Sequence, residues 1–313
     1  MLHLRAVCPV DRTEQVLAAL KEHPGVAHVV LLRGAALDPA GDVVEADLAR
    51  EATDEVVEAL CELGIDHSGG VTLEQVDTAL SDAADRAEEA APGEAADAVV
   101  WEELIARTGE ESRLNATFLA FLTIACLLAA VGVVTDSPVT IVGAMVVGPE
   151  FGPLAAIAVG LVLRRRDLVR RAGLALAAGF PLAMLITFAG AVLGSYTGLF
   201  DRDVVLAAHQ VDFVFQVGPF SLIVALLAGA AGMLSMTSAK SAALVGVFIS
   251  VTTVPAAGFA AIAAVLGEWA ICGRSVLQLV VNLAGIVVAA ALVLALRNRR
   301  RRGRDLGRPL SRG

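Results

Sequence analysis

Residues 137–163 read SPVTIVGAMVVGPEFGPLAAIAVGLVL. The run is long enough to cross a bilayer, which takes about 20 apolar residues. Its middle, however, is interrupted by Gly-Pro-Glu-Phe-Gly-Pro at residues 148–153. Each proline removes a backbone donor and clashes with the preceding turn, and the glycines beside them weaken the helix further. The sequence therefore predicts two half-helices that meet at an unwound turn.

A formal charge lies inside this predicted turn. Glu150 carries it, and an isolated charge at membrane depth costs about 2.5–3.5 kcal/mol on insertion scales. Irregular backbone at that depth is tolerated only where protein buries it or water reaches it. We therefore expect the turn to form a binding site for a substrate or ion, built from Gly148, Pro149, Glu150, Gly152 and Pro153. The alternative is a break close to one membrane interface, where water solvates the carboxylate.

The composition separates the chain into two parts. The 313 residues are 57% hydrophobic with a mean hydropathy of +0.72, which excludes a single soluble domain and indicates a membrane protein. Residues 1–113 hold 25 Asp and Glu against 8 Lys and Arg, whereas residues 114–313 hold 8 against 16. An acidic soluble part is therefore joined to a hydrophobic part with basic edges.

The first 76 residues alternate between strand and helix patterns. Strands are predicted at 2–8, 26–33, 43–48 and 71–76, and helices at 12–22 and 53–63, with a loop over 34–41. This β-α-β-β-α-β order predicts an α+β ferredoxin-like domain over residues 1–76. Such a domain can bind a small ligand or a partner, and the alternative is a plain packing or oligomerisation domain.

Residues 77–113 are rich in Ala, Asp and Glu. They predict an acidic linker or loose helix over 77–98, followed by a juxtamembrane helix over 99–112. The remaining apolar runs predict an α-helical polytopic membrane domain over 114–296. Its six spans are expected at 115–134, 138–163, 169–195, 216–237, 241–266 and 275–296.

The arginines predict the orientation of the chain in the cell membrane. Three of them lie between the second and third spans, two more lie at the start of the third span, and eight lie in the tail over 297–313. Because short cytoplasmic loops collect Lys and Arg, six spans place both termini in the cytoplasm. The tail is expected to contact anionic lipid rather than nucleic acid. The N-terminus lacks the layout of a signal peptide.

Two segments suggest an internal repeat. Residues 154–158 read LAAIA and residues 259–263 read FAAIA, and each follows a proline-containing break in the second span of a three-span group. An odd number of spans per group makes the repeat inverted, as in many transporters. The opposing break would comprise Thr252, Thr253 and Pro255, with Asn282 of the sixth span as a further binding residue. Alternatively, Asn282 only bonds a neighbouring helix.

Several short motifs occur in a recognisable order. They are Glu111-Ser-Arg-Leu-Asn115, Asp136-Ser-Pro138, Ile141-Val-Gly-Ala-Met145 before a Gly-Pro turn, Leu227-Ala-Gly-Ala-Ala-Gly232, Val254-Pro255 and Asn282-Leu283. Over residues 111–296 the chain thus resembles the membrane proteins called domain of unknown function 389, an uncharacterised family. Members usually carry a Ser-Pro-Leu-Met-Gly-Pro type of break, so Glu150 departs from the pattern. The resemblance therefore implies a shared broken helix rather than a shared carboxylate, and it implies no activity.

Two functions remain open from the sequence. The first is a transporter or channel for a small solute or ion, regulated by the cytoplasmic domain. The second is a membrane scaffold or sensor whose soluble domain binds a partner or ligand. We expect no enzymatic activity, cofactor or metal, because no nucleophile–base pair stands out and the four cysteines form no CxxC pair. We also expect a homo-oligomer. The sequence does not identify which solute or ion would be transported.

Overall fold

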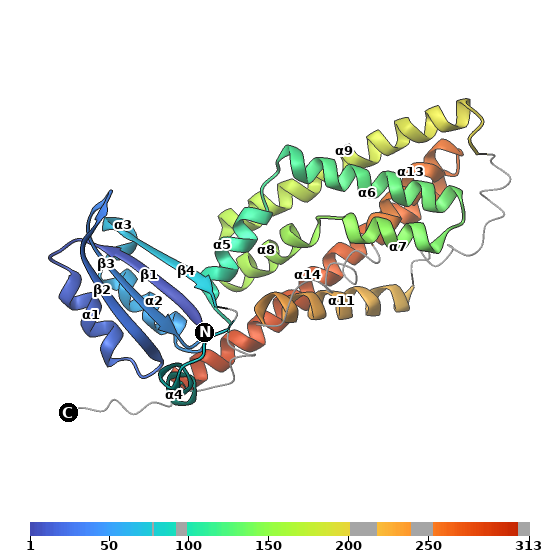
Figure 1. The fold of residues 1–313 in the computed structure, drawn as a ribbon. Helices are drawn as coiled ribbons and strands as arrows, with labels where there is room; N and C mark the ends of the chain where they lie inside the picture. The colour runs from blue at the N-terminus through green and yellow to red at the C-terminus, as the bar shows by residue number, and fades with distance from the viewer. Residues whose placement is uncertain (77, 92–98, 201–217, 239–252, 306–313) are drawn as a thin grey trace. The chain divides into compact units, whose positions relative to one another are not determined.

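The computed structural model describes residues 1–76, 78–91, 99–200, 218–238 and 253–305 (Figure 1). The chain divides into two compact units, of which the first comprises Met1–Leu104 together with Thr237 and Ser238, and the second comprises the other described residues. The N-terminal unit is a small α/β domain, and the C-terminal unit consists of apolar helices.

A four-stranded antiparallel sheet forms the centre of the N-terminal unit. Its strands are β1 (Leu2–Cys8), β2 (Val26–Leu37), β3 (Ala40–Leu48) and β4 (Gly70–Gln75), in the spatial order β2-β3-β1-β4. Helices α1 (Thr13–Glu22) and α2 (Thr53–Glu62) follow β1 and β3, and the short α3 (Ile65–Ser68) precedes β4. The predicted β-α-β-β-α-β order is confirmed.

The core of this unit lies between the sheet and the two longer helices. Alternate residues of β1, such as Leu4 and Cys8, are buried and pack against Leu20 of α1 and Leu60 of α2. A strand buries every second side chain on one face, which is why the alternating pattern predicted this strand. Each fully buried Leu contributes about 1.5–3 kcal/mol of hydrophobic stabilisation.

The predicted loop over residues 34–41 is wrong. The strands β2 and β3 extend to Leu37 and Ala40, and a register shift lies between Leu32 and Ala36. Gly34 adopts a φ of 65° inside this bulge, a conformation that suits glycine, and its N–H donates to Asp42 Oδ1 at 2.8 Å. A bulge therefore occupies the position where the sequence suggested that pairing stops.

Two histidines share one carboxylate on the open face of the sheet. His3 Nδ1 lies 2.8 Å from Asp47 Oδ1, and His28 Nδ1 lies 2.7 Å from Asp47 Oδ2. Burial raises the pKa of Asp47, but the hydrogen bonds from the two imidazoles outweigh it and hold the pKa below its ordinary value.

Asp47→Asn is expected to remove a stabilisation that depends on pH. Because the folded pKa is lowered, the carboxylate stabilises the fold fully above its unfolded pKa of about 3.9 and loses this effect as the pH falls through the lower folded pKa. The variant should be less stable than the wild type by under about 1 kcal/mol at pH 6, since the group is partly solvated, and the difference should shrink as the pH falls towards 3.

Hydrogen exchange of β1 and β3 peptides, corrected for intrinsic rates, measures this difference. The exposed Asp85→Asn is the matched control and should follow the wild type at both pH values. A stability difference that persists unchanged at pH 3 would show that Asp47 acts through packing alone.

The segment predicted as linker contains two helices. Helix α4 (Asp82–Ala90) begins after Ser81, whose hydroxyl accepts the Ala83 N–H at 3.1 Å, and it packs against β2. Helix α5 (Trp101–Glu111) covers most of the predicted juxtamembrane helix.

The C-terminal unit contains long and short apolar helices. They are α6 (Ala116–Val134), α7 (Pro138–Val147), α8 (Phe151–Val162), α9 (Arg166–Tyr196), α11 (Pro219–Thr237), α13 (Val254–Val265) and α14 (Trp269–Asp305). Among the described residues, four helices are long and apolar enough to cross a membrane, and a fifth span results if α7 and α8 form one bent span. Most of the first half of the predicted span 241–266 lies outside the described residues, so the described helices account for up to five of the six predicted spans.

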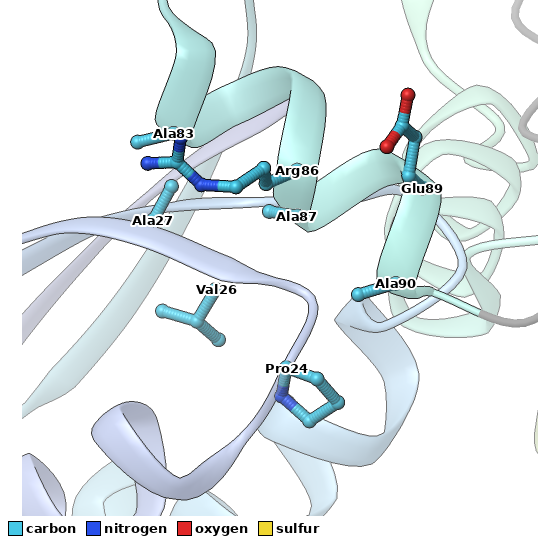
Figure 2. A pocket seen from close by; sticks show the side chains of 8 residues that line it. All are labelled: Pro24, Val26, Ala27, Ala83, Arg86, Ala87, Glu89 and Ala90. Carbon is cyan, nitrogen blue, oxygen red and sulfur yellow. The ribbon is translucent and has the colours of Figure 1, made fainter.

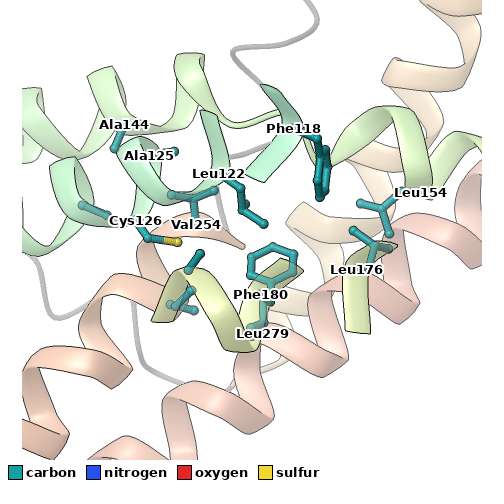
Figure 3. Close-up of a cluster of buried hydrophobic side chains, with 14 of the residues drawn as sticks. Phe118, Leu122, Ala125, Cys126, Ala144, Leu154, Leu176, Phe180, Val254 and Leu279 are labelled. Atoms are coloured by element: carbon teal, nitrogen blue, oxygen red, sulfur yellow. The ribbon is translucent and has the colours of Figure 1, made fainter. Parts of the chain in front are cut away.

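The two short helices α8 and α13 share two neighbours in the packing. Helix α8 packs against α9 and α14, and α13 packs against the same two long helices and against α6. Side chains from these elements converge in one apolar cluster (Figure 3), whose labelled members include Phe118, Leu122, Leu154, Phe180, Val254 and Leu279. The short helices are therefore enclosed by the long ones.

Candidate functional site

The predicted helix break is present. Helix α7 ends at Val147, α8 begins at Phe151, and the two helices are bent by 53°. Only residues 148–150 are non-helical, so Gly148 and Pro149 form the break. Gly152 and Pro153 already lie in the first turn of α8, where a missing N–H costs no intrahelical hydrogen bond.

Glu150 is fully buried at this break. Its side chain precedes α8 at the N-cap position, and 0% of the residue is exposed. Protein therefore surrounds the carboxylate in this structure, so direct solvation, the alternative raised by the sequence, is not what the structure shows. The Thr253 hydroxyl donates a hydrogen bond of 2.6 Å to Glu150 Oε1. Such short bonds to a charged acceptor are about twice as strong as neutral ones.

The partner of Glu150 belongs to the other short helix. Thr253 occupies the N-cap position of α13, with Val254 and Pro255 in its first turn, and it is also fully buried. The N-terminal ends of α8 and α13 thus meet at one carboxylate. Each helix N-terminus carries roughly +0.5 elementary charge, so this arrangement favours a negative group between them. The structure therefore brings together the two predicted breaks, whereas Thr252 lies outside the described residues.

The break is also in close contact with the end of α5. A Cβ at Gly152 would meet Glu111 Cβ at 2.6 Å, so only glycine fits this approach without displacement. Glu111 in turn lies 3.2 Å from the Arg107 guanidinium. The sequence did not indicate Glu111 as part of the site, although it lies in one of the family motifs, because residues 41 positions apart give no pattern of spacing.

Asn282 takes part in a different polar cluster. It is fully buried on α14, and its Oδ1 accepts a hydrogen bond of 3.0 Å from the Ser221 hydroxyl of α11. Gln278 Nε2 donates to the same Ser221 oxygen. These contacts place Asn282 beside α11 and agree with the alternative that it bonds a neighbouring helix. Sequence reasoning missed Ser275 and Gln278, although their spacing with Asn282 puts all three on one helix face.

The N-terminal unit has a separate pocket of about 600 Å³ (Figure 2). The start of β2, with Pro24 and Val26, lines one side, and Arg86, Ala87 and Glu89 of α4 line the other. One basic and one acidic side chain at the rim of an apolar floor can bind a small polar ligand.

Comparison with protein-family models gives one match. The model of the Domain of unknown function (DUF389) matches residues 145–288, a range that begins in α7 and ends in α14 and includes both Glu150 and Thr253. Comparisons with curated proteins and with solved structures found no match. The match agrees with the family that the sequence motifs resemble, and it covers residues 145–288.

Proposed function

We propose that this protein is an integral membrane protein of the cell membrane that transports a small ion or solute, either as a transporter or as a channel. The observation that carries the proposal is the buried Glu150 carboxylate at the meeting point of two helix N-termini. Half-helices that meet at a charged residue are typical of transporter binding sites. Glu150 would contact the cargo, and Thr253 would position its carboxylate.

The helix packing supports an inverted repeat of three spans each. One group would be α6, α7 with α8, and α9, and the other would be α11, the span that ends with α13, and α14. Both short helices have 12 residues, and both pack against α9 and α14. Equivalent neighbours for the two short helices are what a pseudo-two-fold axis in the membrane plane would produce. Six spans would keep both termini in the cytoplasm, with the arginine-rich tail near anionic lipid.

Transport requires a second conformation. Because Glu150 and Thr253 are both 0% exposed, cargo cannot reach the carboxylate in the conformation described here. Alternating access usually moves one repeat against the other around a fixed site. We therefore propose that relative movement of α8 and α13 opens the site to one side at a time.

The N-terminal unit would regulate this movement. Its strand order β2-β3-β1-β4 and its β-α-β-β-α-β sequence support a ferredoxin-like fold. Both edge strands, β2 and β4, offer unpaired backbone groups that favour assembly into a homo-oligomer. In the C-terminal unit, Glu150 would bind the cargo rather than catalyse a reaction, because its contact is to the Thr253 hydroxyl, which holds the carboxylate in place.

A scaffold or sensor is the second candidate. The pocket beside α4 favours it, since ligand binding there needs no pathway through the membrane. In that case the buried pair of Glu150 and Thr253 would only fix the packing of α8 on α13.

Ion flux into vesicles distinguishes the two candidates. The wild type, Glu150→Gln and Asp167→Asn are reconstituted, and dyes report movement of protons, Na⁺, K⁺ and chloride under imposed gradients. Asp167→Asn is the matched control because it removes one negative charge from an exposed position of the same unit. We expect Glu150→Gln to lower at least one flux by about ten-fold or more. Equal fluxes for all three proteins, or none above empty vesicles, would favour the scaffold.

A further inference from the structure

Three buried polar residues form a track along one face of α14. Ser275, Gln278 and Asn282 are 0%, 2% and 0% exposed, and positions separated by three, four and seven residues lie on the same side of a helix. The track faces α11 at Ser221, which contacts both Gln278 and Asn282. Residues 276–296 of α14 are apolar apart from Gln278 and Asn282, whereas Arg274, just before Ser275, is exposed. The three side chains of the track are themselves buried and so are not part of a solvated surface.

Hydrogen bonds within the track run in one direction. Gln278 donates through Nε2 to Ser221, and Ser221 donates to Asn282 Oδ1. At the end of the track toward Ser275, two buried oxygens have no hydrogen-bond partner among the described residues, namely Gln278 Oε1 and Ser275 Oγ. A buried polar atom without a hydrogen bond is destabilising, so two such side chains three positions apart on one helix face point to a bound partner.

The chemistry of these atoms defines the partner. The Gln278 amide oxygen offers only lone pairs, and one of the two amide N–H groups donates to Ser221. The Ser275 hydroxyl can turn its lone pairs toward a cation, whereas an anion would meet the Gln278 oxygen as a second acceptor. A divalent cation is usually held by carboxylates. Uncharged oxygens in a buried site are the ligands that potassium channels use in place of water.

We propose that the Ser275 and Gln278 oxygens bind an alkali metal cation, Na⁺ or K⁺, inside the region that the DUF389 model matches. This inference rests on the proposed transport function in one respect, because it names a cation as the cargo or the coupling ion of that pathway. The site consists of residues other than Glu150 and Thr253, and its occupancy can be measured without any flux.

The experiment is thermal unfolding of the full chain in detergent micelles, with Na⁺, K⁺ or Rb⁺ replacing choline at constant ionic strength. A ligand that binds only the folded state raises Tm, by about 3 °C at ten times its Kd for a unit of this size. We expect one alkali cation to raise the Tm of the wild type, and Gln278→Leu and Ser275→Ala each to lose most of that rise. Thr187→Val, which removes a buried hydroxyl bonded to Ala183 O of its own helix, should keep it.

Each outcome decides the proposal. A wild-type Tm that is the same in all four salts would mean that the track holds only water and would overturn the inference. A rise that survives in both track variants would place the cation elsewhere and would also overturn it. If Gln278→Leu does not fold, Ser275→Ala gives the same readout. A cation-dependent Tm without flux in vesicles would keep this site and reject transport, whereas flux without a cation-dependent Tm would do the reverse.

Discussion

Glu150→Lys is expected to prevent the C-terminal unit from folding. The substitution places a cation, fully buried, against the N-terminal ends of α8 and α13, where the helix dipoles favour a negative group. It also faces the Thr253 hydroxyl with a donor in place of an acceptor. An uncompensated buried charge costs about 3–5 kcal/mol, a large part of the stability of most proteins. Glu150→Gln keeps the shape and an acceptor oxygen and should still fold.

Two measurements test this contrast, namely the yield of monodisperse protein after detergent extraction and the midpoint of unfolding. Asp167→Lys is the matched control because Asp167 also lies in the first turn of a helix, α9, but is exposed. A charge reversal there should cost about 0.3–1 kcal/mol. If Glu150→Lys folded as well as Asp167→Lys, the carboxylate would not lie between two buried helix ends.

Gly229→Ala is expected to produce the second large effect. A Cβ at Gly229 would lie 2.4 Å from Ile286 O and 2.8 Å from Ile286 Cα, both of which are backbone atoms of α14. Backbone cannot rotate away as a side chain can, so α11 and α14 must separate. Overpacking typically costs 1–3 kcal/mol, and we expect a value of about 3 kcal/mol because the whole helix contact shifts.

The unfolding midpoint of Gly229→Ala in a denaturing-detergent titration measures this cost. Gly173→Ala on α9 is its control, since a Cβ there meets nothing within 4 Å and alanine is the better helix former. The control should be as stable as the wild type or slightly more stable. Equal stability of both variants would mean that α11 and α14 do not approach as closely as described.

The helix break and its charge could be predicted from residues 148–153 because proline and glycine act locally. Proline removes a donor wherever it stands, so the end of α7 at Val147 follows from the sequence alone. Where the helix resumes does not follow, since proline is accepted in the first turn, and Pro153 therefore lies inside α8 rather than in the break.

The partners of the break could be predicted only in part. Thr253 was expected in the opposing break because Pro255 interrupts that span, and the hydrogen bond to Glu150 joins the two breaks. Glu111 was not expected near Gly152, because this approach depends on how α5 packs and not on any local pattern. The Gln278 to Ser221 contact was missed for the same reason, although the spacing of Ser275, Gln278 and Asn282 could have indicated a common face.

In the N-terminal unit, the alternation of β1 predicted the buried face because one side of the sheet packs on helices. The extension of β2 through Gly34 could not be predicted in this way. A glycine with a positive φ ends a strand or forms a bulge, and here the Asp42 carboxylate, which accepts the Gly34 N–H, selects the bulge.

The central claim is that the meeting point of α8 and α13 opens to water during transport. Labelling of Thr253→Cys in vesicles tests it most directly, in a background with Cys8, Cys61, Cys126 and Cys272 replaced by alanine. Position 253 is fully buried in the conformation described here, and Asp167→Cys provides an exposed control. We predict that a membrane-impermeant thiol reagent labels position 253 slowly, from one side, and faster under the ion gradient that drives flux. Complete protection of position 253 from both sides under every gradient, with normal labelling of position 167, would contradict the claim and leave the break as a packing device.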